Sequence, residues 1–203
     1  MSNRDCVLLL IFLAFFGDET SVSAQLAALQ VLVFDYTGLS APSLREFTTQ
    51  TKVILSNEGL SAEVEDCTRA TDGPCFSQER VQRRIEIRVV NKAQENHMLV
   101  GGKCLGVSFI NHDGGIDASV YRELADQEAA DFGLPREVVL AYAAAHEAGH
   151  LLLGEAHTPN GLMKAHWGTE EFQAISQRRL TFSSDQRREL TRRYGRSLTG
   201  LIR

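Results

Sequence analysis

The segment Arg136–Leu153, which reads REVVLAYAAAHEAGHLLL, decides what kind of fold the chain adopts. Alanine and leucine, both strong helix formers, fill it. Pro135 stands before its first turn, where a helix tolerates proline, and Gly154 follows its last residue. The run therefore predicts a helix of about five turns. Because most of its side chains are apolar, we expect the helix to be buried.

Two histidines and a glutamate interrupt this apolar helix. His146 and His150 are four residues apart, so their imidazoles project from one face, one turn apart. That spacing lets both rings bind one Zn²⁺ at about 2.0–2.1 Å. Glu147 cannot easily reach the same ion, but it can reach a water beside it. We expect Glu147 to be the general base that takes a proton from this water as the water attacks a zinc-polarised carbonyl.

The third metal ligand follows the helix. Gly154 ends the helix and lets the chain turn back, so that His157 can approach the ion. Three neutral histidines with one open position are typical of catalytic zinc, whereas structural zinc usually has four protein ligands. The alternatives for this position are Glu170, Glu171 and His166.

A glutamate ligand at position 170 would need a second helix, as in thermolysin-like enzymes. Pro159, Gly161 and Gly168 leave little room for that arrangement, which favours His157. His97 and His112 are more typical of solvated loops. A metal-free pair of half-buried histidines is the alternative for the whole motif. It does not explain Glu147, since an unpaired carboxylate on a buried helix is costly.

The segment His146–His157 resembles the signature of the metzincin zinc peptidases, HExxHxxGxxH followed by a methionine turn. It departs from that signature by one residue, because Gly154 comes four residues after His150 and gives HExxHxxxGxxH. Met163 stands in the place of the family's methionine. The resemblance implies that the thioether of this residue lies beneath the histidines.

The run from His146 to Trp167 is also similar to a set of secreted bacterial metzincin-like proteins. These resemblances imply a secreted zinc-dependent metalloendopeptidase that hydrolyses a peptide or protein substrate. They also imply that the strand from Lys103 to Ile110 binds extended substrate by β-pairing. Two other functions remain open from the sequence, a zinc-binding module without turnover and a zinc hydrolase of a non-peptide amide or ester.

Outward from the helix, the chain predicts a mixed α+β fold. Alternating or β-branched runs predict strands at Leu29 to Asp35, Ser61 to Asp66, Arg84 to Asn91, Cys104 to Asn111 and Ile116 to Tyr121. Further helices are expected over Pro42 to Ser56, Glu123 to Asp131 and Ser184 to Tyr194. We expect one metzincin-like catalytic domain over residues 25–203, with a small twisted sheet, an active-site helix and a short C-terminal subdomain.

The first 24 residues resemble a secretory signal peptide, with the apolar run Val7 to Phe16 before the small residues Val22-Ser23-Ala24. This run is shorter than the roughly 20 residues that a membrane span needs. We therefore expect a secreted or periplasmic protein that is not held in a membrane. In an oxidising compartment Cys67 and Cys75 are natural disulfide partners, and Cys104 is expected to be a buried, inert thiol.

The net charge of −5 argues against a nucleic-acid partner. The short arginine pairs at 83–84 and 187–188 do not overturn this, because each is better explained as part of a solvated face. The sequence does not indicate an oligomeric state.

Overall fold

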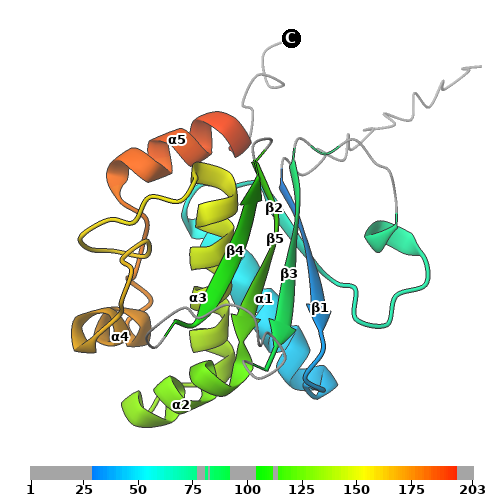
Figure 1. The fold of residues 1–203 in the computed structure, drawn as a ribbon, viewed down its shortest axis with the longest axis horizontal. Helices are drawn as coiled ribbons and strands as arrows, with labels where there is room; N and C mark the ends of the chain where they lie inside the picture. The colour runs from blue at the N-terminus through cyan, green and yellow to red at the C-terminus, as the bar shows by residue number, and fades with distance from the viewer. Residues whose placement is uncertain (1–28, 77–80, 82, 92–103, 112–113, 196–203) are drawn as a thin grey trace, which may run out of the picture.

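A five-stranded mixed sheet forms the frame of the protein (Figure 1). The computed structural model describes residues 29–76, 81, 83–91, 104–111 and 114–195. The strand order is β2-β1-β3-β5-β4, with the first four parallel and β4 antiparallel to β5. The strands are β1 (Leu29–Asp35), β2 (Ala62–Asp66), β3 (Arg83–Val90), β4 (Gly106–Asn111) and β5 (Gly114–Tyr121).

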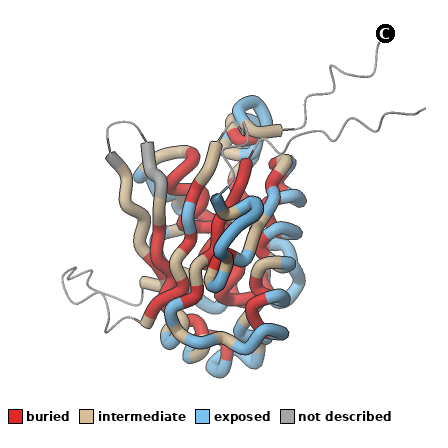
Figure 2. Tube along the Cα trace, turned by 90° about the vertical axis from the view of Figure 1, so that its right-hand side faces the viewer, coloured by how far each residue is buried: buried red, intermediate tan, exposed pale blue. Residues whose placement is uncertain are grey.

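The helices pack against this sheet and against one another. They are α1 (Ala41–Asn57), α2 (Arg122–Phe132), α3 (Arg136–Leu153), α4 (Thr169–Ser176) and α5 (Ser184–Tyr194), with a short 3-10 turn η1 at Gly73–Cys75. Helix α1 is the crossover between the parallel strands β1 and β2, and it packs beside α3. Figure 2 shows the buried residues between the strands and the helices, with the exposed residues on the outer sides of the helices.

Strand β1 and helix α3 form the centre of the hydrophobic core, which is why their side chains are mostly apolar. Leu29, Val31 and Val33 of β1 are fully buried, as expected of an inner strand of a parallel sheet. Helix α3 contacts α1, α2, α5 and the strands β3, β4 and β5, and it is buried from Val138 to Leu152. The helix that carries the histidines is therefore packed against other elements on nearly every side.

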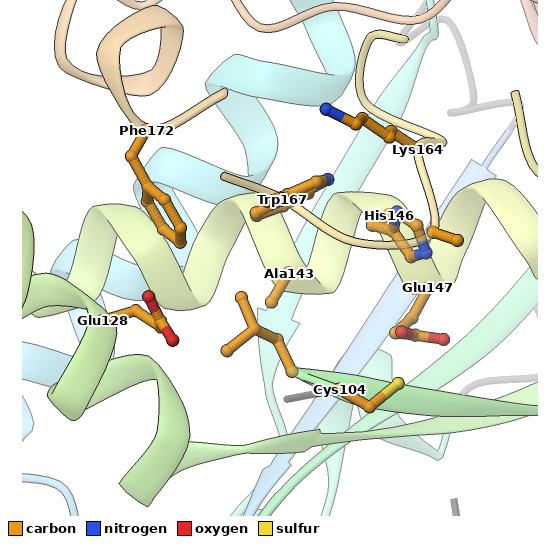
Figure 3. A pocket seen from close by; sticks show the side chains of 10 residues that line it. Cys104, Glu128, Ala143, His146, Glu147, Lys164, Trp167 and Phe172 are labelled. Carbon is orange, nitrogen blue, oxygen red and sulfur yellow. The ribbon is translucent and has the colours of Figure 1, made fainter. Parts of the chain in front are cut away.

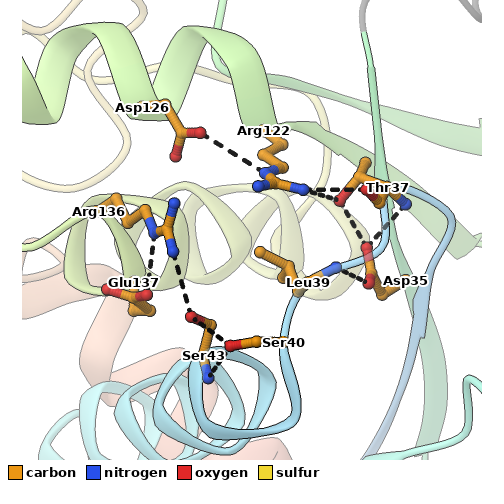
Figure 4. Close-up of polar contacts among 9 residues, drawn as sticks. All are labelled: Asp35, Thr37, Leu39, Ser40, Ser43, Arg122, Asp126, Arg136 and Glu137. Atoms are coloured by element: carbon orange, nitrogen blue, oxygen red, sulfur yellow. Dashed lines mark hydrogen bonds and ion pairs between the residues drawn. The ribbon is translucent and has the colours of Figure 1, made fainter.

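Polar contacts connect the end of β1 with the starts of α1, α2 and α3 (Figure 4). The carboxylate of Asp35 accepts hydrogen bonds from both the amide and the hydroxyl of Thr37, at 2.8 and 2.7 Å. Arg122 at the start of α2 donates to the carbonyl oxygen of Thr37 at 2.9 Å. Arg136, the first residue of α3, donates to the hydroxyl of Ser43 on α1. The contacts of Thr37 thus tie the end of β1 to the start of α2, and the contact of Ser43 ties α1 to the start of α3.

The mixed α+β class that the sequence predicts is confirmed. The five predicted strands and four of the helices lie at the expected places, with bounds that differ by a few residues. Helix α4 was not predicted, because Gly168 was interpreted as a helix breaker. Gly168 instead precedes the first residue of the helix, and its amide donates to the carboxylate of Glu171 at 2.8 Å.

The predicted disulfide between Cys67 and Cys75 is present, with Cα atoms 5.6 Å apart. It closes the turn after β2. Cys104 lies outside this disulfide and is only half-buried, not buried as the sequence predicts, and its Sγ lies 3.1 Å from the carbonyl oxygen of Gly106. The predicted signal peptide at residues 1–24, and also Lys103, His97 and His112, lie outside the described residues. None of the helices that the structure describes is long and apolar enough to cross a membrane.

Candidate metal centre

Three histidine nitrogens converge at the C-terminal end of α3. Nε2 of His150 lies 3.1 Å from Nε2 of His146 and 3.2 Å from Nε2 of His157. Within the described part of the chain, these three residues are the one group of histidine, cysteine or acidic side chains placed to hold a metal ion. The structure therefore brings together the three residues that the sequence predicts as ligands, and they can bind a metal.

The opposite ring nitrogens are held by backbone oxygens. Nδ1 of His146 lies 2.7 Å from the carbonyl oxygen of Leu162, and Nδ1 of His150 lies 3.1 Å from that of Gly154. A carbonyl oxygen only accepts, so each Nδ1 must carry the hydrogen. In a neutral imidazole the other nitrogen is then bare. Both Nε2 atoms consequently present lone pairs, as metal-binding histidines do.

Two bare nitrogens 3.1 Å apart repel each other unless a cation lies between them. A proton is a poor candidate at neutral pH, because burial lowers the pKa of His146 to about 4, and the neighbouring histidines lower it further. The pKa of His150 is lowered as well, again mainly by burial. Two imidazole nitrogens that share one tetrahedral zinc at about 2.0–2.1 Å are about 3.3–3.4 Å apart. The observed separations therefore fit a shared metal ion.

The turn after α3 brings His157 next to His150, although the sequence has one residue more between His150 and Gly154 than the metzincin signature. Gly154 has a φ of 104°, which favours glycine, and its amide donates to the carbonyl oxygen of His150 at 2.8 Å. After His157, the amide of Thr158 donates to the carbonyl oxygen of Met163 at 2.9 Å. Both ends of the segment are thus fixed, which holds the exposed His157 against the two buried histidines.

Met163 lies against the helix backbone between the first two histidines. It is fully buried. A Cβ atom added to Gly149 would lie 2.4 Å from the sulfur of Met163 and 2.7 Å from the ring of Phe182. The thioether therefore needs a glycine at position 149. Met163 thus packs against the turn of α3 that precedes His150.

Glu147 is almost fully buried, with 4% of its surface exposed. Its Oε2 accepts a hydrogen bond from the hydroxyl of Ser108 on β4 at 2.7 Å. Burial raises the pKa of Glu147 to about 7, and the Ser108 hydrogen bond opposes that rise. Glu147 and His146 line one pocket (Figure 3). A carboxylate whose pKa is near neutrality is suited to taking and returning a proton.

The three alternative candidates for the third metal ligand, Glu170, Glu171 and His166, lie outside the histidine cluster. Glu171 forms an ion pair with Nζ of Lys164 at 2.7 Å and caps α4. Neither Glu170 nor His166 belongs to the group placed to bind a metal, and both are exposed. The geometry thus favours His157 over the three alternatives.

Two residues that hold Glu147 and His146 in place were not predicted from the sequence. One is Ser108, whose contact with Glu147 joins residues 39 apart. The other is Leu162, whose carbonyl oxygen accepts from His146 and also from the indole of Trp167 at 3.3 Å. A backbone oxygen has no sequence signature. The serine could have been noticed only as a polar residue within an apolar strand.

A comparison of the chain with protein-family models found no match, and neither did a comparison with curated proteins.

Proposed function

We propose that the protein is a secreted zinc-dependent metalloendopeptidase of the metzincin kind. The observation that carries this proposal is the convergence of three Nε2 atoms next to a buried carboxylate that lines the same pocket. The donor set consists of imidazoles, which suit zinc. Three histidines leave a fourth position for a small molecule, as in catalytic zinc sites. The disulfide between Cys67 and Cys75 supports an oxidising, extracytoplasmic location.

His146, His150 and His157 would hold the metal. When bound there, zinc acts as a Lewis acid that lowers the pKa of a water to about 7 and polarises a carbonyl. Glu147 accepts the proton of the attacking water as the new C–O bond forms. It then gives a proton to the amide nitrogen as the C–N bond breaks, so that a carboxyl and an amine result. Ser108 holds the carboxylate in place for both transfers.

The position of β4 suits an extended peptide. Among the described strands, β4 has a neighbour on one side only, and that neighbour is β5. Ser108, in the middle of this edge strand, contacts Glu147. A substrate that pairs with the edge of β4 would therefore pass close to the general base.

The test compares wild type with His157→Ala and Glu147→Gln in zinc content and in cleavage of casein and a peptide library. We expect one zinc per wild-type chain and chelator-sensitive cleavage. Glu147→Gln should keep zinc and lose cleavage by a factor of about 10²–10⁴, the usual contribution of a general base. His157→Ala should lose zinc affinity. His166→Ala is the matched control, since it removes an exposed histidine outside the cluster.

Each other outcome has a definite meaning. If His157→Ala binds zinc as tightly as wild type, the third ligand lies elsewhere and Glu170 becomes the candidate. If wild type binds zinc but cleaves only non-peptide amides or esters, the protein is a hydrolase of another substrate. If wild type binds zinc and hydrolyses none of these, it is a binding module.

A further inference from the structure

The cavity beside Glu147 is small (Figure 3). Its volume is about 40 Å³, whereas one buried water needs about 10–15 Å³ by the same measure. The cavity thus has room for about three waters, or for a side chain of about one to three heavy atoms. A cavity that binds benzene has a volume of about 150 Å³. An aromatic or long aliphatic side chain therefore does not fit unless the walls move.

The wall opposite β4 is held in place by the packing of the protein. Ala143 is buried on α3, one turn before the first histidine. The indole of Trp167 donates to the carbonyl oxygen of Leu162 at 3.3 Å, and it packs edge-on against Phe172 with ring centroids 6.2 Å apart. Phe172 is itself buried and stacks on Phe132 at 4.2 Å. A larger cavity on this side would require several packed groups to move.

Leu105 lines the cavity from the segment directly before β4 and is only half-buried. Its carbonyl oxygen accepts a hydrogen bond from the amide of Tyr121 at 2.8 Å. This bond fixes the backbone of Leu105 at the end of β5. The size of the side chain at position 105 therefore determines how much space remains on the side of β4.

The charged side chains that line the cavity beyond the histidine cluster are already engaged. Nζ of Lys164 forms an ion pair with Glu171 at 2.7 Å. Glu128 of α2 also has an interaction partner within the protein. We therefore expect the cavity to discriminate between entering side chains by their size.

We propose that the protein cleaves peptides next to a small residue, glycine, alanine or serine, and that Leu105 sets this size limit. The side chains of alanine and serine fit into about 40 Å³, and glycine leaves the cavity to water. A leucine or phenylalanine side chain would have to displace Leu105 or the aromatic wall. This inference rests on the proposed peptidase function, because the cavity beside His146 and Glu147 would receive the substrate residue next to the cleaved bond.

A peptide library gives the first test. Wild type, Leu105→Ala and Leu39→Ala digest the library, and the residues beside each cleaved bond are identified by mass spectrometry. We expect wild type to cleave next to glycine, alanine or serine about tenfold more often than next to leucine, because side-chain atoms that do not fit cost at least that much. Leu105→Ala should lose most of this preference. Leu39→Ala also truncates a half-buried leucine, but one outside the cavity, and should keep the preference.

The binding of two hydroxamates to the zinc-loaded protein tests the cavity without turnover. Acetohydroxamate and isovalerohydroxamate share the chelating group, and their methyl and isobutyl groups match the side chains of alanine and leucine. Trp167 is the one tryptophan of the chain and lines the cavity, so its fluorescence reports binding there. Leu105→Ala should bind isovalerohydroxamate about tenfold more tightly, relative to acetohydroxamate, than wild type does. Leu39→Ala should leave this ratio unchanged.

The outcomes are distinct. Cleavage without a preference for small residues, or with a preference that Leu105→Ala retains, overturns the size limit but keeps the peptidase. If no peptide is cleaved, the peptidase proposal fails and the hydroxamates decide. A ratio of affinities that changes in Leu105→Ala alone then supports the size-limited cavity, and a ratio that stays unchanged overturns it. If neither hydroxamate binds and no peptide is cleaved, both proposals fail.

Discussion

The hydroxyl of Ser108 on the edge strand β4 donates to the carboxylate of Glu147 on α3 at 2.7 Å. It also lies 3.0 Å from the carbonyl oxygen of the same glutamate. This contact ties the strand that suits substrate binding to the group that suits proton transfer. A shift of β4 would therefore also move the carboxylate of Glu147, the proposed general base.

Replacing Ser108 by alanine should lower kcat without removing the metal. A hydrogen bond to a charged group contributes about 1.5–3 kcal/mol, which corresponds to about a tenfold to hundredfold loss in rate. Ser108→Thr keeps a hydroxyl and should recover most of the rate. Ser119→Ala on β5 is a matched control, because its hydroxyl has no hydrogen-bond partner among the described residues. Equal loss in both alanine variants would contradict a positioning role for Ser108.

Gly106→Ala should impair catalysis at a second contact between β4 and Glu147. An added Cβ would lie 2.7 Å from Cγ of Glu147 and 2.7 Å from the backbone oxygen of Ser119. Since the backbone oxygen cannot move cheaply, the strand or the glutamate must shift, at a cost of about 1–3 kcal/mol. We expect reduced kcat and reduced unfolding free energy with zinc still bound. Gly168→Ala, where the nearest atom is 3.9 Å away, should leave the unfolding free energy closer to wild type.

Gly149→Ala should weaken metal binding by displacing Met163, which packs against α3 next to His150. The new Cβ would lie 2.4 Å from the sulfur of Met163, which must move. We expect lower zinc affinity in a chelator competition and a loss of about 1–3 kcal/mol in stability. Adding Met163→Ala removes the nearest contact, so the two substitutions should cost less together than their sum. Strict additivity would show that the sulfur contact does not transmit the effect.

The ligand-bearing helix could be predicted because its determinants are local. The spacing of His146 and His150, the alanine-rich composition and the stop at Gly154 all lie within one short segment. The same holds for the disulfide between Cys67 and Cys75, whose cysteines are separated by 8 positions. Helical and strand periodicities act over similarly short distances, which is why most elements were found.

Contacts between distant segments could not be predicted. The sheet order puts β3 between β1 and β5, and no local pattern fixes that order. The Ser108–Glu147 bond depends on how β4 packs on α3. The presence of Glu128 in the pocket depends on how α2 packs beside α3. Helix α4 was missed because a glycine before a helix has the same local appearance as a glycine that prevents one.

Glu58, at the end of α1, is a buried carboxyl remote in sequence from the histidines. Its side chain is 2% exposed, and its Oε2 has no hydrogen-bond partner among the described residues. Nε of Arg187 on α5 lies 3.9 Å away, too far for a hydrogen bond. Burial raises the pKa of Glu58 to about 7, although the charge of Arg187 opposes this rise.

Glu58 should therefore make the protein less stable as the pH rises from about 4.5 to 7. Its pKa is higher in the folded state than the ordinary value of 4.5, so the folded state binds more protons over this interval. The stabilisation is complete below pH 4.5 and is lost above pH 7, by about 2–4 kcal/mol. Glu58→Gln should remove this loss and be more stable than wild type at pH 8. Urea unfolding of both proteins from pH 5 to 8 isolates this residue, because the other titrating groups are shared. A constant difference between the two curves would mean that Glu58 titrates normally in the folded protein.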